Sequence, residues 1–143
     1  MSDLKSLSQA GWMGKSAEFQ VSLEPALIEK FAELSGDRNP IHLSNDHALS
    51  LGFASRVAHG MLLAGLVSRL VGEYLPGGDV LLLSIKVDFH QPSHAGDLLN
   101  VSGCVVNESS ATRTLEIQFQ IQHGRGIACK GKVLVQLQNK LPA

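Results

Sequence analysis

Residues 60–74, GMLLAGLVSRLVGEY, decide the fold of this chain. If this stretch is a helix, apolar side chains occupy nearly its whole circumference, at Met61, Leu62, Leu63, Ala64, Leu66, Val67, Leu70 and Val71. A helix with so little polar surface is expected in the interior of a protein. The stretch is too short to span a bilayer and contains Arg69. It therefore predicts a central, buried helix and no membrane partner.

The part of the chain after Gly77 is typical of β-strands. Apolar and polar residues alternate, as in strands with one apolar face, over residues 83–90, 99–105, 115–122 and 127–137. The links between these stretches are rich in turn-forming residues, which predicts an antiparallel meander. A sheet with one dry face needs a cover, and the helix at 60–74 is the only candidate of the right size. The sequence therefore predicts an α+β hotdog fold, in which an antiparallel β-sheet wraps around a long central buried α-helix.

The first 35 residues are expected to add a short strand and a second helix. Residues 17–21 are predicted to form the strand. Ser22 is the predicted N-cap of a helix that runs to about Ser35, with Pro25 tolerated in its first turn. Residues 1–15 show no clear period and are expected to be a loose lead-in to a single domain that spans residues 1–143.

The charge balance limits the class of partner. Twelve basic residues stand against thirteen acidic ones, and the sequence has no basic run. This balance argues against nucleic acid as the main partner, although a phosphorylated cofactor would need only a few local cations. Ser, Asp, Lys and Gln dominate the first residues, without the charged and apolar regions of a signal peptide, so a cytoplasmic protein is expected.

The two cysteines, Cys104 and Cys129, are predicted to be reduced thiols. Each falls in a strand-like stretch, and their parity along the strands points them to opposite faces of the sheet. No Cys-x-x-Cys spacing suggests zinc. His90 and His94 are four residues apart, a metal-like spacing on a helix, but here they flank Pro92 in a turn. Two other histidines, His47 and His123, are expected to be solvated, and no metal is inferred.

A second informative stretch, residues 31–42 (FAELSGDRNPIH), places an acid and an imidazole five residues apart. Gly36 follows a helical apolar repeat as a terminator able to adopt positive φ, and Pro40 disfavours the α conformation at the residue before it. Asp37 is therefore expected on the way out of a helix, and His42 on an extended segment beyond the proline. This bend can aim both side chains at one water molecule. A carboxylate and an imidazole are the natural pair for moving protons near neutral pH.

These residues also have a purely structural interpretation. Asp, Asn and Pro are ordinary turn formers, so Asp37 or Asn39 could simply hydrogen-bond nearby backbone N–H groups. His42 could be a partly buried loop histidine. Residues 37–58 as a whole are expected to be a long irregular or weakly helical segment, and loops of this length inside compact domains are often functional.

The pattern Gly36-Asp37-x-Asn39-Pro40-x-His42 resembles the signature of the MaoC-like, (R)-specific enoyl-CoA hydratases, also called hydratase 2. A second block, His59-Gly60-Met61-Leu62, resembles the start of that family's central helix. The likeness runs from about residue 16 to about residue 137. It implies the hotdog fold and reversible addition of water to trans-2-enoyl-CoA, giving (R)-3-hydroxyacyl-CoA. It also implies a homodimer with active sites near the subunit contact. A homodimer is expected from the sheet as well, because edge-to-edge pairing of two copies would bury an exposed strand edge.

The roles that follow centre on three residues. Asp37 is expected to take a proton from the attacking water while His42 orients the water and helps to deliver a proton to C2, and the reverse assignment stays open. The backbone N–H of Gly60, at the positive end of a helix dipole, is the expected donor to the thioester oxyanion. Asn39 and Pro40 are expected to structure the loop. Ser68 and Val71 are expected to line the acyl pocket. On the residues alone, tight packing at the helix start is an equal alternative for Gly60, and ordinary core contacts are an equal alternative for Ser68 and Val71.

Three other functions remain open on the sequence. They are a 3-hydroxyacyl-ACP dehydratase, a hotdog acyl-CoA thioesterase, and a non-catalytic protein that only binds acyl thioesters. The intact acid and imidazole argue against the third. No cofactor is expected, because coenzyme A is part of the substrate. Acyl chain length, carrier and pathway are left undetermined.

Overall fold

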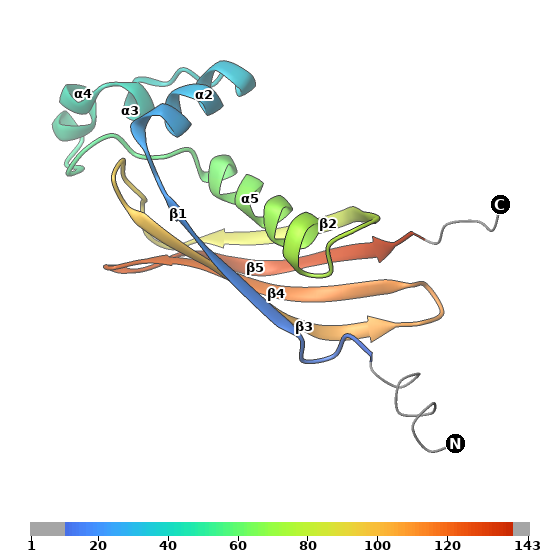
Figure 1. The fold of residues 1–143 in the computed structure, drawn as a ribbon. Helices are drawn as coiled ribbons and strands as arrows, with labels where there is room; N and C mark the ends of the chain where they lie inside the picture. The colour runs from blue at the N-terminus through green and yellow to red at the C-terminus, as the bar shows by residue number, and fades with distance from the viewer. Residues whose placement is uncertain (1–10, 139–143) are drawn as a thin grey trace, which may run out of the picture.

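A computed structural model describes residues 11–138 of the chain, which form one five-stranded antiparallel sheet with its helices on one face (Figure 1). The strands are β1 (Ser16–Ser22), β2 (Val80–Phe89), β3 (Leu98–Ser109), β4 (Thr114–His123) and β5 (Gly126–Leu137). Their order across the sheet is β1-β3-β4-β5-β2, so β1 and β2 are the two edges. The four strands after residue 77 are the four that the alternating pattern predicts.

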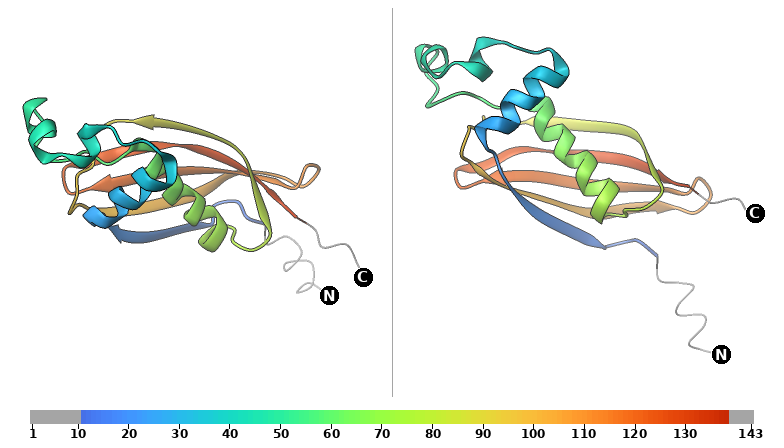
Figure 2. Two further views of the ribbon diagram at one scale, coloured as in Figure 1. Left: turned by 90° about the horizontal axis from the view of Figure 1, so that it is seen from above. Right: turned by 45° about the horizontal axis from the view of Figure 1, so that its top comes forward.

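The helices are α2 (Pro25–Ser35), α3 (Pro40–Leu43), α4 (Asn45–Ser50), α5 (Gly60–Arg69) and a π-helical turn, η1 (Leu70–Tyr74). α5 and η1 together cover the stretch predicted as the central helix. Figure 2 shows α5 lying along one face of the sheet, while α2, α3 and α4 gather beyond its N-terminal end. None of the described helices is long and apolar enough to cross a membrane.

The core lies between α5 and the inner faces of β3, β4 and β5. Many of the side chains that fill it have at most 1% of their surface exposed, including Val67 and Leu70 from the helices and Val101, Ile117, Phe119 and Val135 from the strands. Burial of this apolar surface is the main stabilising contribution to the fold. The predicted hotdog arrangement, a sheet curved around a buried helix, is confirmed.

The edge strand β2 departs from its predicted pattern. Its register shifts between Leu82 and Ser84, and its large apolar side chains remain 37 to 53% exposed, at Leu81, Leu82, Leu83, Ile85 and Phe89. Only Val80 and Val87 pack partly against the core. The sequence correctly predicts a strand here, but most of the strand's apolar side chains remain uncovered by the described chain.

The boundaries of α2 correct one sequence-based prediction. Ser22 is the last residue of β1 and not the N-cap, since its Oγ donates a hydrogen bond to Oε1 of Glu24 at 2.8 Å. Glu24 is the N-cap, and Pro25 occupies the first helical position, where its missing N–H has no intrahelical partner to lose. Gly36 ends the helix with φ of 78°, as predicted for a glycine C-cap.

Residues 11–15, predicted to belong to a loose lead-in, are tied to the sheet instead. The backbone N–H of Trp12 donates to Glu108, and Gly14 and Lys15 exchange backbone hydrogen bonds with Val105. The ammonium group of Lys15 lies 4.6 Å above the Trp12 ring, a cation–π contact. Residues 1–10, the rest of the predicted lead-in, lie outside the described residues.

Both cysteines are free thiols, as predicted. Cys129 is buried in the core, and its burial raises the pKa of the thiol to about 11. Cys104 is partly exposed and borders a hollow on the outer, polar face of the sheet. Their different surroundings agree with the opposite faces that strand parity predicts.

Candidate active site

Asp37 follows α2 in a turn that its own side chain helps to hold. The backbone N–H of Asp37 donates to Oγ of Ser35 at 3.1 Å, and Oδ1 of Asp37 accepts the N–H of Asn39 at 3.2 Å. The turn-forming interpretation of this residue is therefore partly correct. The second carboxylate oxygen, Oδ2, takes no part in the turn and faces His42.

His42 lies in the short helix α3 and not on the extended segment predicted for it. Pro40 occupies the first position of this helix, because a proline breaks a helix that precedes it but fits the start of a new one. Asn39 is the N-cap, and its Oδ1 accepts the N–H of Ile41 at 3.2 Å. Such contacts are typical of loop-structuring residues.

Asp37 and His42 converge, as the sequence predicts. Nε2 of His42 lies 3.7 Å from Oδ2 of Asp37. Nδ1 of His42 is 2.6 Å from the carbonyl oxygen of Val57, which can only accept, so Nδ1 carries a proton and donates it there. Nε2 is then the nitrogen free to accept or release a proton. Two atoms 3.7 Å apart can both hydrogen-bond one water molecule at ordinary distances.

His59 completes the cluster, although sequence reasoning gave it no role. Its ring stacks on the His42 ring with centroids 3.8 Å apart and packs against Phe31 at 4.8 Å. Its Nε2 lies 2.9 Å from the backbone carbonyl of Asp37, so it donates a proton there. The side chain is only 2% exposed. His59 thereby connects the start of α5 to the loop that carries Asp37 and supports one face of the His42 ring.

Asp37, His42 and His59 also form the one group among the described residues whose ligand atoms lie close enough together, within 4.8 Å, to hold a metal ion. Their geometry fits proton transfer better. Ligand imidazoles point a ring nitrogen at a shared ion, whereas these two rings stack nearly parallel, 23° apart.

Gly60 begins α5 and lines a pocket of about 310 Å³. The lining includes His42, Leu63 and Phe89 as well as the loop residues Gln91 to Ser93. Because the first N–H groups of a helix have no partner within it, the Gly60 N–H is available to a ligand in this pocket. Asp37 does not line the pocket, but its carboxylate approaches Nε2 of His42, a residue that does.

Ser68 and Val71, predicted to share one face of the helix, do not share a surface. Ser68 is exposed, whereas Val71 is 3% exposed and belongs to the core. The helix changes from α to π at Leu70, which alters the spacing on which the prediction depends. Neither residue lines the pocket that contains His42 and Gly60.

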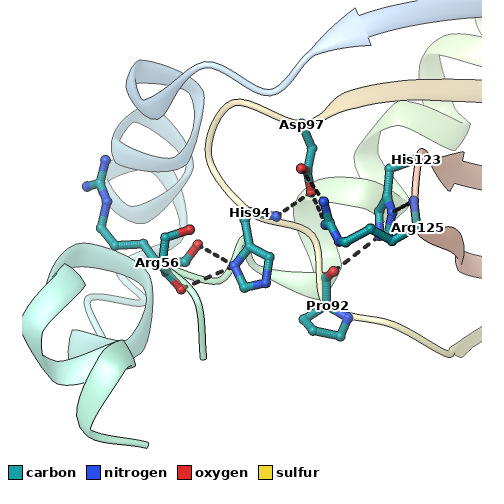
Figure 3. A network of polar contacts seen from close by, with 7 residues as sticks. Arg56, Pro92, His94, Asp97, His123 and Arg125 are labelled. Carbon is teal, nitrogen blue, oxygen red and sulfur yellow. Dashed lines mark hydrogen bonds and ion pairs between the residues drawn. The ribbon is translucent and has the colours of Figure 1, made fainter. Parts of the chain in front are cut away.

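A polar network holds the loop between β2 and β3, which forms one wall of the pocket (Figure 3). Arg125 donates two hydrogen bonds to the Asp97 carboxylate, at 2.9 and 2.6 Å. Asp97 also accepts the backbone N–H of His94, whose ring Nδ1 donates to the backbone carbonyls of Ser55 and Arg56. The network fixes this loop to the segment that leads into α5.

His123, expected to be solvated, is buried and belongs to the same network. Its Nδ1 accepts the N–H of Arg125, and its Nε2 donates to the carbonyl of Pro92 at 3.2 Å. The prediction fails because the residue ends β4 beneath the β2–β3 loop, a contact between distant parts of the chain. His47 is exposed, as predicted.

The Asp97 carboxyl has a pKa below its ordinary value. Burial works to raise this pKa, but the hydrogen bonds from Arg125 and from the His94 backbone outweigh it, together with the attraction of Arg125 and His123. In turn, the hydrogen bond to Asp97 raises the pKa of Arg125. The loop is thus held by a charged pair at neutral pH.

Two residues at the site, His59 and Phe89, have no role in the sequence-based prediction. His59 directly precedes the helix start that was singled out, so its position at the site follows from that of Gly60. Phe89 belongs to an apolar strand pattern that does not distinguish a core residue from a pocket residue. Only the pairing of β2 at the sheet edge brings Phe89 to the start of α5.

The fold and the site define a hotdog domain with a carboxylate and an imidazole beside the N-terminus of its central helix. The family described as MaoC like domain matches residues 10–124, and the chain belongs to this family. The chain is 36% identical over 110 residues to a 3-hydroxybutyryl-CoA dehydratase of Methylorubrum extorquens, covering 77% of this chain and 70% of that protein.

A second relative is the (R)-specific enoyl-CoA hydratase of Aeromonas caviae. It is 33% identical over 127 residues, which cover 87% of this chain and 94% of the relative. The solved structure of the (R)-hydratase from A. caviae involved in PHA biosynthesis superposes with a TM-score of 0.86 and 30% identity, covering 91% of this chain and 99% of that chain. The resemblance stated from the Asp37–His42 signature is confirmed.

Proposed function

We propose that this protein is an (R)-specific enoyl-CoA hydratase, which adds water reversibly to a trans-2-enoyl-CoA to give the (R)-3-hydroxyacyl-CoA. The proposal depends on one observation: Asp37 Oδ2 and His42 Nε2 lie 3.7 Å apart, beside a pocket that His42 and Gly60 both line. Relatives named (R)-specific enoyl-CoA hydratase and 3-hydroxybutyryl-CoA dehydratase support it, since hydration and dehydration are the two directions of one reaction.

The reaction needs one proton taken from water and one delivered to carbon. The water oxygen attacks C3 of the enoyl group, and a proton from the site is added to C2. Asp37 is proposed to take the proton from the water while His42, through Nε2, orients the water and helps to deliver a proton to C2. The opposite assignment, in which His42 takes the proton from the water and Asp37 helps to deliver one to C2, gives the same product.

Attack at C3 moves negative charge onto the thioester oxygen. The N–H of Gly60 is proposed to donate to that oxygen, because it is unpaired within the helix and lies at the positive end of the helix dipole. His59 is proposed to hold the proton-transfer loop at the correct distance from this donor. Asp37 and His42 are then proposed to transfer the protons and the Gly60 N–H to stabilise the oxyanion, so the proposed mechanism includes no metal and no redox cofactor.

A homodimer is the second part of the proposal. β2 is an edge strand with exposed apolar side chains, and an exposed edge of this kind favours pairing with another copy. Antiparallel pairing of two β2 strands would join the two sheets and give a symmetric interface. Phe89 lies on β2 and lines the pocket, so such a contact would approach both active sites.

One assay separates the proposed function from the alternatives. The protein is incubated with trans-but-2-enoyl-CoA, and the conjugated double bond is followed by its absorbance while free thiol is titrated in parallel. Loss of absorbance without thiol release, with a product of R configuration, is expected. Thiol release would identify a thioesterase, and no change in either signal would indicate a protein that only binds acyl thioesters.

The carrier is tested in the same assay. Repeating it with the enoyl group on acyl carrier protein distinguishes the proposed function from a 3-hydroxyacyl-ACP dehydratase, which would prefer that substrate. Dialysis against a chelator is expected to leave the rate unchanged. The protein is proposed to be cytoplasmic. Imaging a tagged copy of the chain in cells tests this compartment.

A further inference from the structure

Phe89 and Gly60 are in unusually close contact. A Cβ atom on Gly60 would lie 3.0 Å from both Cε1 and Cζ of the Phe89 ring, a distance at which a neighbour must move. Both residues line the same pocket. The contact joins the last residue of edge strand β2 to the first residue of α5, and glycine is the residue that leaves the ring enough room.

The ring therefore borders the place where the thioester would lie. In standard backbone geometry the Cβ position is about 2.5 Å from the nitrogen of its own residue, so the ring edge lies within about 5.5 Å of the Gly60 nitrogen. An oxygen that accepts the Gly60 N–H sits about 2.9 Å from that nitrogen. The carbonyl carbon and C2 of the substrate are the next atoms along, and the ring, which lines the same pocket, is within reach of them.

From this contact we infer that Phe89 determines specificity at C2, and that the site takes enoyl thioesters with no branch there. This inference rests on the proposed function and adds the substrate class. A flat ring beside the carbonyl leaves room for a planar enoyl group. A methyl group on C2 would enter the space that the ring already fills, as a methyl on Gly60 would.

The first test compares two substrates, trans-but-2-enoyl-CoA and trans-2-methylbut-2-enoyl-CoA. In wild-type protein kcat/KM should strongly favour the unbranched thioester. In Phe89→Leu and Phe89→Ala the ratio of branched to unbranched kcat/KM should rise at least about tenfold, since one methyl group in an apolar pocket accounts for discrimination of about 10- to 200-fold. Phe53→Leu, in the loop outside this pocket, is the matched control and should leave the ratio unchanged.

The second test examines the contact itself. Gly60→Ala keeps the backbone N–H but adds a methyl group against the ring, so its activity on the unbranched thioester should fall by about tenfold or more. Phe89→Ala in the same chain should restore most of that loss, because residues in contact have non-additive effects. Thermal unfolding of the four proteins should show the same coupling, which does not depend on any activity.

The outcomes are distinct. Wild-type protein that hydrates neither substrate rejects the proposed function and the substrate class inferred from it. Wild-type protein that hydrates the unbranched thioester, with a substrate ratio unchanged in both Phe89 variants, rejects the inference and leaves the function intact. Strictly additive effects of Gly60→Ala and Phe89→Ala, in both activity and unfolding, would show that the contact does not limit the space at Gly60.

Discussion

β4 and the segment from Asp37 to His59 contain opposite kinds of side chain. In β4 the inward residues Leu115, Ile117, Phe119 and Ile121 are at most 1% exposed and bury apolar surface only. In the segment, Asp37 is half exposed and His42 partly exposed, and Asp37, Asn39 and His42 each make a hydrogen bond between the side chain and the backbone.

This difference separates stability from chemistry. A side chain buried among apolar neighbours contributes to the free energy of unfolding, but it has no proton to exchange and no access to a ligand. In the segment, Asp37 and His42 are not fully buried, so two titratable groups remain accessible beside a pocket. Substitutions in β4 should therefore change stability, and substitutions in the segment should change activity.

The largest effect is expected at the acid and the imidazole. Asp37→Asn keeps the turn acceptor but removes the carboxylate, and His42→Ala removes Nε2. Each should lower kcat for hydration by roughly 10²–10⁴-fold while the fold persists. Asp46→Asn and His47→Ala, exposed residues of α4 in the same segment, are the matched controls and should keep nearly full activity. Full activity in either site variant would contradict the proposed chemistry.

In β4 the expected loss is in stability. Phe119→Ala should lower the free energy of unfolding by about 3–5 kcal/mol, because it leaves a cavity in a packed core. Phe53→Ala, in the partly exposed segment, should cost about 1 kcal/mol. Denaturant unfolding of both variants measures the difference. Equal losses at the two positions would break the distinction between the regions.

β2 resembles neither region in the isolated chain, because its side chains are apolar like those of β4 but exposed. A substitution on β2 is expected to have a smaller effect, on the oligomeric state. Leu83→Lys places a charge on the exposed edge and should convert the proposed dimer into the 15.3 kDa monomer at micromolar concentration. Leu34→Lys, an exposed leucine on α2, is the control and should leave the mass unchanged. Light scattering gives both masses, and a wild-type protein of monomer mass would reject the dimer.

The smallest expected effect concerns the Asp97–Arg125 pair, which joins the sheet to the pocket loop. Because the pKa of Asp97 is lowered in the folded state, the pair stabilises the protein above the ordinary pKa of about 3.8 and loses this contribution as pH falls through the folded value. Asp97→Asn should cost about 1 kcal/mol at pH 7, since Arg125 is half exposed.

The difference between wild type and Asp97→Asn should shrink as the pH falls below 3.8. Urea unfolding at pH 7 and at pH 3 measures it. A difference that stays constant over this range would mean that the charge of Asp97 does not contribute to stability. Arg113→Gln, an exposed arginine in the β3–β4 turn, provides a control for the loss of one surface charge.

The elements themselves were predictable because their signals are local. The apolar repeat of residues 60–74, the alternation in β4 and the glycine after Ser35 each fix a backbone conformation with no reference to distant residues. The convergence of Asp37 and His42 was predictable for the same reason, since five residues and one turn separate them. The extended conformation expected at His42 was wrong because Pro40 starts a helix as readily as it ends one.

What the sequence by itself determined is the central helix, the helix that ends at Ser35, all five strands, the pair of proton-transfer groups and the family. Only the tertiary structure decided which neighbours they meet. It stacked His59 on His42, buried His123 under the β2–β3 loop and left β2 uncovered. It also set the Phe89 ring against Gly60. Periodicity records which way a side chain points from its own element, whereas burial and contact depend on residues far away in the chain.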